Sequence, residues 1–286
     1  MIISVASGKG GTGKTTISTN LALALQEQEQ VSLLDCDVEE PNAHIFIRPE
    51  INFEETAYIF VPKIDQDRCD GCGKCADICR FNAIAVIGQE VMVFPELCHS
   101  CKGCQLVCPE RAIMADKREL GQISGGKSRS LDFIQGCSRI GEAMSPPLID
   151  QVLAKNNYEG LTIIDAPPGT SCPVISSIKG SNFVILVTEP TPFGLHDLIL
   201  AVETVKVLGI PCGIVINRAN LGFDKVHKYA EEENIPILLE IPFDQKIAEI
   251  YSTGKMLIDE MPEWKERFNE VYVKIKNIID QKEVLQ

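Results

Sequence analysis

The stretch Gly8–Thr15, GKGGTGKT, constrains the fold of this chain more than any other part of the sequence. It fits the pattern G-x-x-x-x-G-K-[ST] and lies between an apolar run, residues 2–6, and a helical pattern, residues 15–28. Glycines let backbone N–H groups surround a phosphate, and the N-terminus of the following helix adds partial positive charge. The sequence therefore predicts a phosphate-binding loop, with Lys14 at the β- and γ-phosphates and the Thr15 hydroxyl on Mg²⁺.

Apolar runs alternate with helical patterns along most of the 286 residues, 45% of which are hydrophobic. Such continuous runs predict strands buried on both faces, and the helices between them predict right-handed crossovers in a mostly parallel sheet. The predicted fold class is a doubly wound α/β domain. Strands are expected at residues 2–6, 31–35, 161–165, 183–188, 212–217 and 237–241, and helices at 15–28, 194–208, 224–233 and about 262–280.

A cysteine-rich repeat interrupts this pattern. CDGCGKCADICRFNAI, residues 69–84, and CHSCKGCQLVCPERAI, residues 98–113, superpose at an offset of 29 residues. Both follow the bacterial ferredoxin spacing C-x₂-C-x₂-C-x₃-C, in which the fourth cysteine of each run ligates the other cluster. We therefore predict a small inserted α+β, ferredoxin-like domain at 62–117, with 1–61 and 118–286 forming one discontinuous P-loop domain. The expected [4Fe–4S] ligands are Cys69, Cys72, Cys75 and Cys108 for one cluster, and Cys79, Cys98, Cys101 and Cys104 for the other.

Two features of the repeat leave room for other interpretations. Paired C-x₂-C motifs also occur in tetrahedral zinc sites, although the third cysteine and the x₃ spacing favour iron–sulfur clusters. Arg80 stands where the ferredoxin pattern has a proline, which Pro109 keeps in the second repeat. Because that proline is not a ligand, the departure concerns local geometry and reduction potential.

Acidic residues end two of the predicted strands. Asp35 and Asp37 follow the strand at 31–35, and Asp165 ends the strand at 161–165. In α/β sheets, ligands bind at the carboxyl ends of the strands, so these carboxylates are expected to meet near the phosphate loop. A single aspartate at a strand end can equally be a helix cap or a turn former. Together with the loop, the three predict Mg²⁺ and water positioning.

With this phosphate loop and these aspartates, the chain resembles the deviant-P-loop ATPases. That group includes cell-division and partition ATPases, cytosolic iron–sulfur scaffold ATPases and the nitrogenase iron protein. The residues that carry the resemblance are Lys9 in KGGTGKTT, the DCD at 35–37, DAPPGT at 165–170 and VINRA at 215–219. The chain is most like the MinD/ParA-superfamily ATPases that contain an inserted two-[4Fe–4S] ferredoxin domain. The resemblance covers essentially the whole chain.

The resemblance implies a homodimer with ATP at its interface. Lys9 would be the signature lysine that reaches the partner's phosphates; without the resemblance it is a solvated loop lysine. Asp37 would orient the attacking water, so Lys9, Lys14 and Asp37 are the expected catalytic residues. Thr15, Asp35 and Asp165 would complete the Mg²⁺ site. The expected nucleotide-binding residues are Gly10, Gly11, Thr12, Gly13, Lys14, Thr15, Thr16 and, at the adenine, Asn217.

Four cysteines lie outside the repeat. Cys36 and Cys212 fall in or beside buried strands and are expected to be small core residues. Cys137 and Cys172 lie on either side of Asp165 at offsets similar to those of two cysteines of the nitrogenase iron protein, where two subunits share one cluster. The resemblance thus suggests a third, dimer-bridging cluster; two unligated thiols are the alternative.

Net charge and composition limit the kinds of molecule to which this protein is expected to bind. A net charge of −13 disfavours nucleic acid and anionic lipid surfaces, so neither nucleic-acid binding nor stable membrane binding is expected. No apolar run reaches the length of a membrane span, and no signal sequence is apparent, so a cytoplasmic location is expected.

From the motifs and the resemblance together, we expect an ATPase that couples nucleotide-driven dimerisation to iron–sulfur chemistry with a redox partner protein. The alternatives are an iron–sulfur carrier or scaffold ATPase and a spatial organiser of the MinD/ParA kind.

Overall fold

The apolar runs form the middle of a nine-stranded sheet in the computed structural model, which describes residues 1–157 and 159–284. The strand order is β11-β10-β9-β1-β8-β2-β7-β6-β3, and β11 through β7 run parallel, whereas β6 is antiparallel to both β7 and β3. The expected mostly parallel sheet and all six expected strands are confirmed. The strands are β1 (Ile2–Ser7), β2 (Val31–Asp35), β3 (Glu50–Ile64), β6 (Ile113–Ser128), β7 (Leu131–Ser138), β8 (Leu161–Pro168), β9 (Phe183–Thr188), β10 (Cys212–Asn217) and β11 (Ile237–Ile241).

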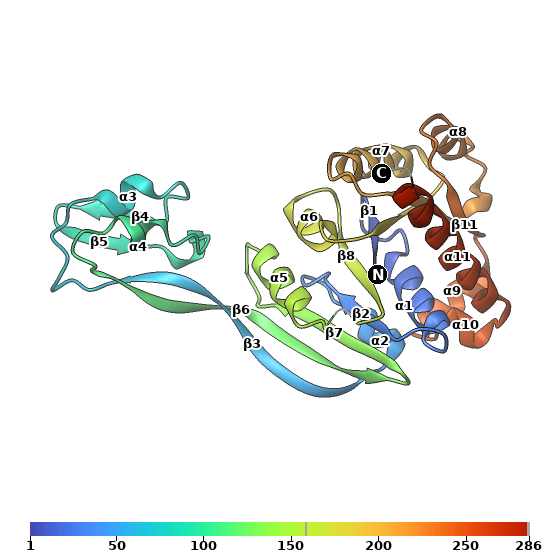
Figure 1. Ribbon diagram of the computed structural model, residues 1–286, viewed down its shortest axis with the longest axis horizontal. Coiled ribbons are helices and arrows are strands. Elements are labelled where there is room, and N and C mark those ends of the chain that lie inside the picture. The colour runs from blue at the N-terminus through green and yellow to red at the C-terminus, as the bar shows by residue number, and fades with distance from the viewer. Residues whose placement is uncertain (158, 285–286) are drawn as a thin grey trace.

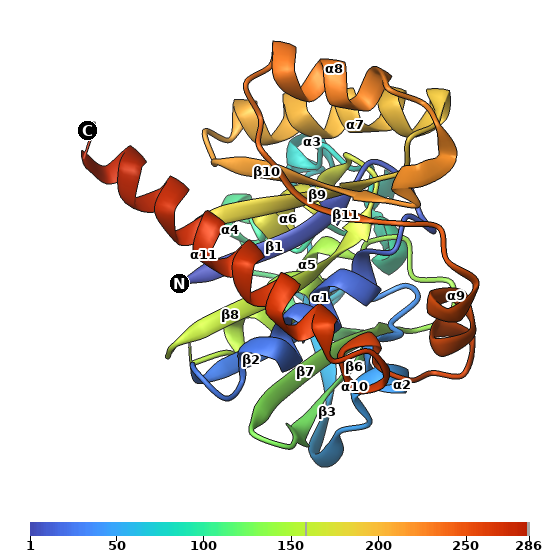
Figure 2. The same ribbon diagram turned by 90° about the vertical axis from the view of Figure 1, so that its right-hand side faces the viewer.

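Helices cover both faces of the sheet, as the doubly wound pattern requires (Figures 1 and 2). One face packs against α1 (Lys14–Leu25), α2 (Ala43–Ile47), α9 (Gln245–Ser252), α10 (Leu257–Glu260) and α11 (Glu263–Val284). The other packs against α5 (Pro146–Ala154), α6 (Cys172–Ile178), α7 (Pro192–Val207) and α8 (Lys225–Glu232). No helix in the described part of the chain is long and apolar enough to cross a membrane.

The side chains of neighbouring residues in one strand pack on opposite faces of the sheet. In β2, Leu33 packs with α1 and α11, whereas Leu34 packs with α5; in β8, Ile163 and Ile164 divide in the same way. Because side chains alternate along a strand, a strand covered on both faces must be apolar at every position. This is why the central strands could be recognised in the sequence.

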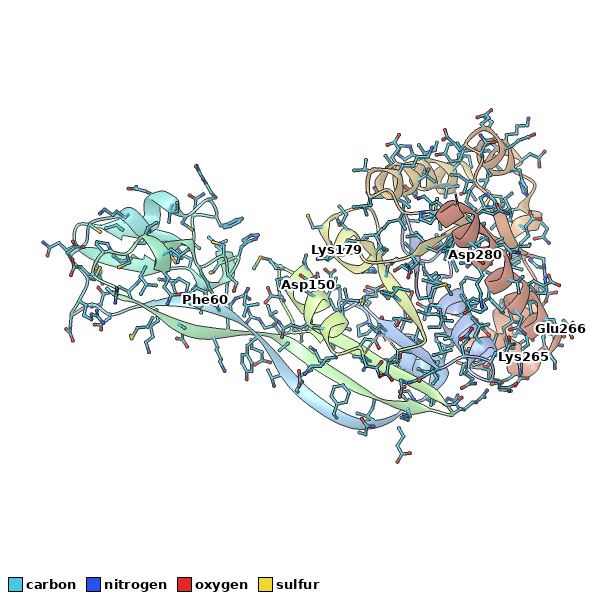
Figure 3. All side chains as sticks on the ribbon, viewed as in Figure 1. Phe60, Asp150, Lys179, Lys265, Glu266 and Asp280 are labelled. Atoms are coloured by element: carbon cyan, nitrogen blue, oxygen red, sulfur yellow. The ribbon has the colours of Figure 1, made fainter. Side chains whose placement is uncertain are left out.

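Strands β3 and β6 form a long two-stranded ribbon that carries a small lobe away from the main body (Figure 1). From Ile113 to Glu119, β6 pairs only with β3; its pairing with β7 begins at Gly121. The lobe contains α3 (Lys74–Ile78), β4 (Ile84–Ile87), β5 (Glu90–Val93), the 3₁₀-helix η1 (Pro95–Leu97) and α4 (Gly103–Val107). In Figure 3, Phe60 lies where the ribbon meets the lobe, whereas Asp150 and Lys179 lie in the main body, where α5 meets α6.

The domain boundaries expected at 61/62 and 117/118 therefore fall inside two paired strands: Val61 pairs with Asp116, and Phe60 with Lys117. The lobe's small sheet consists of β4 and β5, which are antiparallel. Its two short helices, α3 and α4, pack together, and each contains the third cysteine of one repeat. The expected boundaries remain a prediction.

Candidate nucleotide and cysteine sites

The loop between β1 and α1 has the backbone shape that its glycines permit. Gly11 and Gly13 have φ values of 77° and 98°, which side chains with a Cβ rarely adopt. A Cβ on Gly8 would lie 2.2 Å from the Asp197 carbonyl oxygen, so this glycine allows α7 to approach the loop. Lys14 begins α1 and is 7% exposed. The loop thus presents backbone N–H groups and one nearly buried cation to the cleft above it.

This cleft has a volume of about 410 Å³ and lies at the carboxyl ends of the parallel strands. It brings together the phosphate loop, the segment after β2, the end of β10 and the segment from the end of β11 into α9. The expected site residues that line it are Gly10, Gly11, Gly13, Lys14, Thr15, Thr16, Asp37 and Asn217. Thr12, which also belongs to the loop, is buried and does not line the cleft.

Asp165 is fully buried at the end of β8, and neither of its carboxylate oxygens has a hydrogen-bond partner among the described residues. Burial raises the pKa of Asp165 to about 6, and Lys14 and the hydroxyls of Thr15 and Ser18 limit the rise. A buried carboxylate without a partner is costly unless a cation binds it. Asp165 and the neighbouring Thr15 hydroxyl therefore fit Mg²⁺, which prefers oxygen ligands.

Asp35 pairs in register with Asp165 on the adjacent strand but has different partners. Its carboxylate accepts hydrogen bonds from the backbone N–H groups of Asp37 at 3.1 Å, Asn42 at 3.0 Å and Ala43 at 3.0 Å. Burial, followed by the charge of Asp165, raises the pKa of Asp35 well above its ordinary value. In this structure Asp35 is an anchor for the segment 37–43, and its expected role as a Mg²⁺ ligand remains a prediction.

Asp37 lies two residues beyond β2 and lines the cleft. Burial raises its pKa to about 6, with Lys14 acting in the opposite direction. A carboxylate in this position can accept a proton or orient a water near the phosphate loop. Its predicted role is compatible with this placement.

Lys9 belongs to a charged group with Glu189 and Arg218, two residues that were not predicted to be site residues. Its ammonium lies 3.9 Å from the carboxylate of Glu189, and the guanidinium of Arg218 lies 2.8 Å from the same carboxylate. The Glu189 side chain is only 10% exposed, whereas that of Lys9 is 34% exposed. Glu189 directly follows β9, so the signal that identified Asp35 and Asp165, an acid at the carboxyl end of a buried strand, could also have identified it.

Asn217 ends β10 and reaches the phosphate loop. Its Nδ2 donates to the carbonyl oxygen of Thr12 at 2.9 Å, and its Oδ1 accepts from the N–H of Arg218 at 2.9 Å. The side chain therefore supports the loop while also lining the cleft. The expected contact with adenine remains a prediction.

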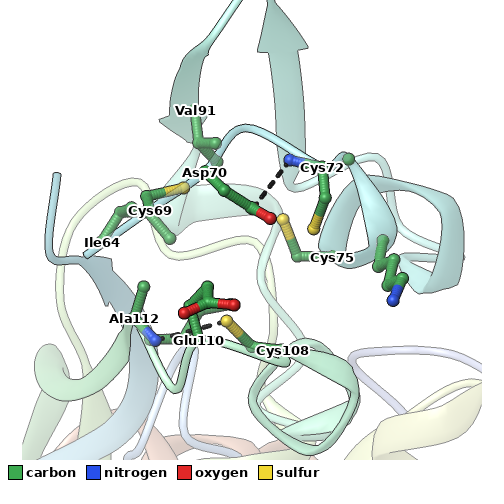
Figure 4. Close-up of a pocket in the computed structure, with 12 residues that line it drawn as sticks. Ile64, Cys69, Asp70, Cys72, Cys75, Val91, Cys108, Glu110 and Ala112 are labelled. Atoms are coloured by element: carbon green, nitrogen blue, oxygen red, sulfur yellow. Dashed lines mark hydrogen bonds between the residues drawn. The ribbon is translucent and has the colours of Figure 1, made fainter.

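The eight repeat cysteines gather in two separate places. One pocket of the lobe is lined by Cys69, Cys72, Cys75 and Cys108, whose sulfur atoms face a common space in Figure 4. A second pocket is lined by Cys79, Cys98, Cys101 and Cys104. Each quartet combines three cysteines of one repeat with the fourth of the other, which is the exchange expected from the ferredoxin spacing.

Backbone N–H groups point at the sulfur atoms in both quartets. Ala83 donates to Cys79 Sγ and Ala112 donates to Cys108 Sγ, each at 3.3 Å and four residues downstream of its cysteine. Such N–H···S bonds stabilise thiolate ligands and tune the reduction potential of a cluster. The thiol donors and their arrangement therefore fit two [4Fe–4S] clusters. No group of three or more His, Cys, Asp or Glu in the described part of the chain is arranged to hold a single metal ion.

The other four cysteines divide by exposure. Cys36 is buried in one hydrophobic cluster of the main body, and Cys212 is partly buried against another, in line with their expected packing role. Cys137 and Cys172 are exposed, and both lie at the carboxyl edge of the sheet, on β7 and at the start of α6. Strand β2 separates β7 from β8, the strand that precedes α6, so β7 and β8 lie roughly 10 Å apart. Shared ligation of a third cluster remains a prediction.

Comparison with known proteins places this geometry in a family. Residues 3–258 match the model of the CobQ/CobB/MinD/ParA nucleotide binding domain. The chain belongs to this family. An uncharacterized protein of Methanocaldococcus jannaschii is 31% identical over 263 residues, covering 90% of this chain and 91% of the relative. The family is one of P-loop ATPases, and the phosphate loop of this chain lies at the carboxyl ends of parallel strands, where α/β sheets bind ligands.

Other proteins that are similar to this chain carry more specific names. The iron-sulfur cluster carrier protein of Rickettsia typhi is 28% identical over 258 residues, covering 86% of this chain and 63% of that protein. The septum site-determining protein MinD from Pyrococcus horikoshii, complexed with Mg-ADP, has a TM-score of 0.61 at 21% identity, covering 97% of this chain and 96% of that chain. At that identity the likeness establishes the fold alone.

Proposed function

We propose that this protein is an ATPase whose ATP-dependent dimerisation and loop movements control two [4Fe–4S] clusters in its small lobe. The observation that carries the proposal is the arrangement of the eight repeat cysteines in two crossed quartets, on a family member with an intact phosphate loop. When bound, the clusters would supply one-electron transfer. The cysteines on this chain would hold them, and the N–H groups of Ala83 and Ala112 would donate hydrogen bonds to two of the ligating sulfur atoms.

For ATP hydrolysis, each residue has a role that its position supports. Backbone N–H groups of the loop and Lys14 bind the phosphates, Thr15 and Asp165 hold Mg²⁺, and Asp37 orients the attacking water. When bound, Mg²⁺ neutralises charge on the phosphate oxygens. Asp35 fixes the segment that carries Asp37, through its three backbone hydrogen bonds.

Dimerisation is the next element of the proposal. Lys9 is held by Glu189 in the single chain, but a third of its side chain is accessible, so it is free to turn toward the phosphates of a second subunit. Arg218 would then neutralise Glu189 alone. In the same dimer, the exposed Cys137 and Cys172 of both subunits would supply four thiols for a bridging cluster.

A second function is favoured by one group of relatives. The proteins from Rickettsia typhi and Pyrococcus abyssi, 28% and 27% identical, are both named iron-sulfur cluster carrier proteins. As a carrier, this chain would deliver a cluster from the exposed Cys137 and Cys172, whereas the clusters of the lobe would be retained. The MinD/ParA-like organising function has no comparable support beyond the shared fold.

The deciding experiment is anaerobic purification with counts of iron and sulfide, and electron paramagnetic resonance with and without ATP. Two clusters give about eight irons per chain, and a bridging cluster shared by two chains raises this to about ten. Lys14→Ala should weaken ATP binding roughly 10- to 100-fold, because a charge-assisted contact is lost. It should also remove any ATP effect on the cluster signal.

Cys75→Ser and Cys137→Ser separate the two kinds of cysteine site. Loss of one cluster in the first variant supports the lobe clusters. A fall from about ten irons to about eight in the second variant supports the bridging cluster, whereas about eight irons in both the unaltered chain and the second variant argues against it. Transfer of iron and sulfide from the intact protein to an apo-ferredoxin would favour the carrier function. Fewer than four irons per chain after anaerobic reconstitution would refute the cluster proposal.

A further inference from the structure

A cluster of four charged side chains joins the small lobe to the main body. Glu96 lies in η1 of the lobe, two residues before Cys98, and its carboxylate is 3.2 Å from Arg139 Nη2 and 3.8 Å from Arg118 Nε. Arg118 belongs to the ribbon strand β6, and Arg139 directly follows β7. Glu142 accepts from both arginines: from Arg139 Nε at 3.1 Å, and from Arg118 Nη1. We refer to Glu96, Arg118, Arg139 and Glu142 as the hinge cluster.

Two members of the hinge cluster are buried. The side chains of Glu142 and Arg118 are 1% and 6% exposed, whereas those of Arg139 and Glu96 are 33% and 66% exposed. A buried ion pair is costly to break, because removing one partner leaves an uncompensated charge. Glu142 therefore fixes the position of both arginines, and the arginines in turn hold Glu96 from the lobe.

The hinge cluster continues into the nucleotide site through short contacts. Ser138, next to Arg139, donates its backbone N–H to the carbonyl oxygen of Val38 at 2.7 Å. Ser145, three residues beyond Glu142, donates its hydroxyl to the carboxylate of Glu39. Val38 and Glu39 directly follow Asp37, so the segment 138–145 contacts both the Asp37 segment and the lobe.

The hinge cluster is also incompletely paired. Arg118 Nε and Nη2 are buried and have no hydrogen-bond partner among the described residues, and Glu96 lies 3.8 Å from Nε, beyond hydrogen-bond distance. A small displacement of the lobe would bring Glu96 within reach of Arg118. In that second arrangement the four side chains of the hinge cluster would be better paired, and two such arrangements are what a two-state element requires.

We propose that Glu142 is a positioning residue that, through Arg118 and Arg139, ties the second cysteine site to the segment carrying Asp37. This inference rests on the proposed function and names the route by which nucleotide binding reaches the lobe. A shift of the Asp37 segment moves Val38 and Glu39, which displaces the segment 138–145 and its two arginines. Glu96 and the neighbouring Cys98 then move with them.

The test is hydrogen–deuterium exchange of the full-length, anaerobically purified protein, with and without a non-hydrolysable ATP analogue. In the unaltered chain, the analogue should slow exchange both in residues 36–45 and in residues 94–101, the latter by roughly fivefold. In Glu142→Gln, the response of 36–45 and the affinity for the analogue should persist, whereas the response of 94–101 should be lost. Glu55→Gln, which removes the exposed Glu55–Lys155 ion pair at the base of the ribbon, is the matched control and should behave as the unaltered chain.

A second variant guards against a folding defect. Glu96→Gln removes only the exposed end of the hinge cluster and should reduce the response of 94–101 without changing the melting temperature. A response at 94–101 that survives in both variants overturns the positioning role and leaves the proposed function intact. If the unaltered chain responds at 36–45 but not at 94–101, both the positioning role and the proposed coupling are overturned.

Discussion

The acidic residues at the carboxyl ends of the strands show how one residue type takes different roles according to its neighbours. Asp35 has three backbone N–H donors for its carboxylate, Asp165 has none, and Glu189 has two cations. All three are nearly or fully buried at the same edge of the sheet. The sequence pattern identifies such positions, but the division of roles depends on which loop folds over each carboxylate.

The first prediction concerns the pH dependence of stability in the unliganded protein. Burial raises the pKa values of Asp37 and Asp165 to about 6 in the folded state, so the folded state binds protons more tightly than the unfolded chain. The free energy of unfolding should therefore fall as the pH rises from about 4 to 6. Mg²⁺ with ADP offsets this loss, so the Mg²⁺-dependent part of the ADP stabilisation should be larger at pH 7.5 than at pH 5. Thermal melts with ADP, with and without Mg²⁺, measure it.

Asp165→Asn provides the decisive variant for this prediction. It should abolish the Mg²⁺-dependent shift, which for near-saturating ligand amounts to roughly 2–3 kcal/mol, or several degrees in melting temperature. It should also weaken the fall in stability between pH 4 and 6. Asp150→Asn, which alters an exposed ion pair with Lys179, should leave both unchanged. An unaltered Mg²⁺ shift in Asp165→Asn would show that another group holds the metal.

At the level of elements, the ribbon explains which parts of the fold the sequence revealed and which it did not. The central strands were predictable because both faces are covered, so residues such as Leu33 and Leu34 are both apolar. In β3, residues 50–55 are exposed and mostly polar, so an apolar run marks only residues 57–61 of this 15-residue strand. The long ribbon, β7 and α5 were not among the predicted elements. The two pockets of the lobe are lined by the cysteine groups that the spacing predicts, and the clusters themselves remain a prediction.

Gly121 marks the point where the ribbon leaves the sheet. A Cβ there would lie 2.1 Å from the carbonyl oxygen of Cys137, on the neighbouring strand β7. The adjacent Leu120 forms a bulge opposite β3, and its carbonyl accepts from the N–H of Arg139 at 2.8 Å. Gly121 thus permits the close contact from which β6 diverges.

The second prediction follows from this contact. Gly121→Ala should force β6 away from β7 and lower the free energy of unfolding by roughly 1–3 kcal/mol, because a backbone atom cannot yield as a side chain can. Urea unfolding measures the change. Gly180→Ala is the control, since a Cβ at Gly180 meets nothing within 4 Å. If both variants have equal stability, the β6–β7 contact is not the constraint that we infer.

On the scale of the whole molecule, the main body and the lobe have separate hydrophobic cores among the described residues. The three hydrophobic clusters of the main body contain no described residue from 61–116, whereas the lobe has two small clusters that include several of the cysteines themselves. A lobe with so little apolar core is expected to depend on the proposed iron–sulfur clusters for its stability, in the way that small metal-binding domains depend on their metal. The body and the lobe should therefore respond differently to loss of iron.

The third prediction makes this separation testable. Phe60 and Lys117 face each other in the antiparallel ribbon, so replacing residues 61–116 with Asn-Gly should close the ribbon as a two-residue hairpin. The shortened protein should fold, bind ATP with the affinity of the full chain and unfold in one transition. In the full chain, an iron chelator under reducing conditions should unfold the lobe, seen as rapid hydrogen exchange in 66–112, while exchange in β1 and β8 stays slow. A shortened protein that cannot bind ATP would show instead that the insert is part of the ATPase fold, because the body would then lack a contact that its three clusters do not supply.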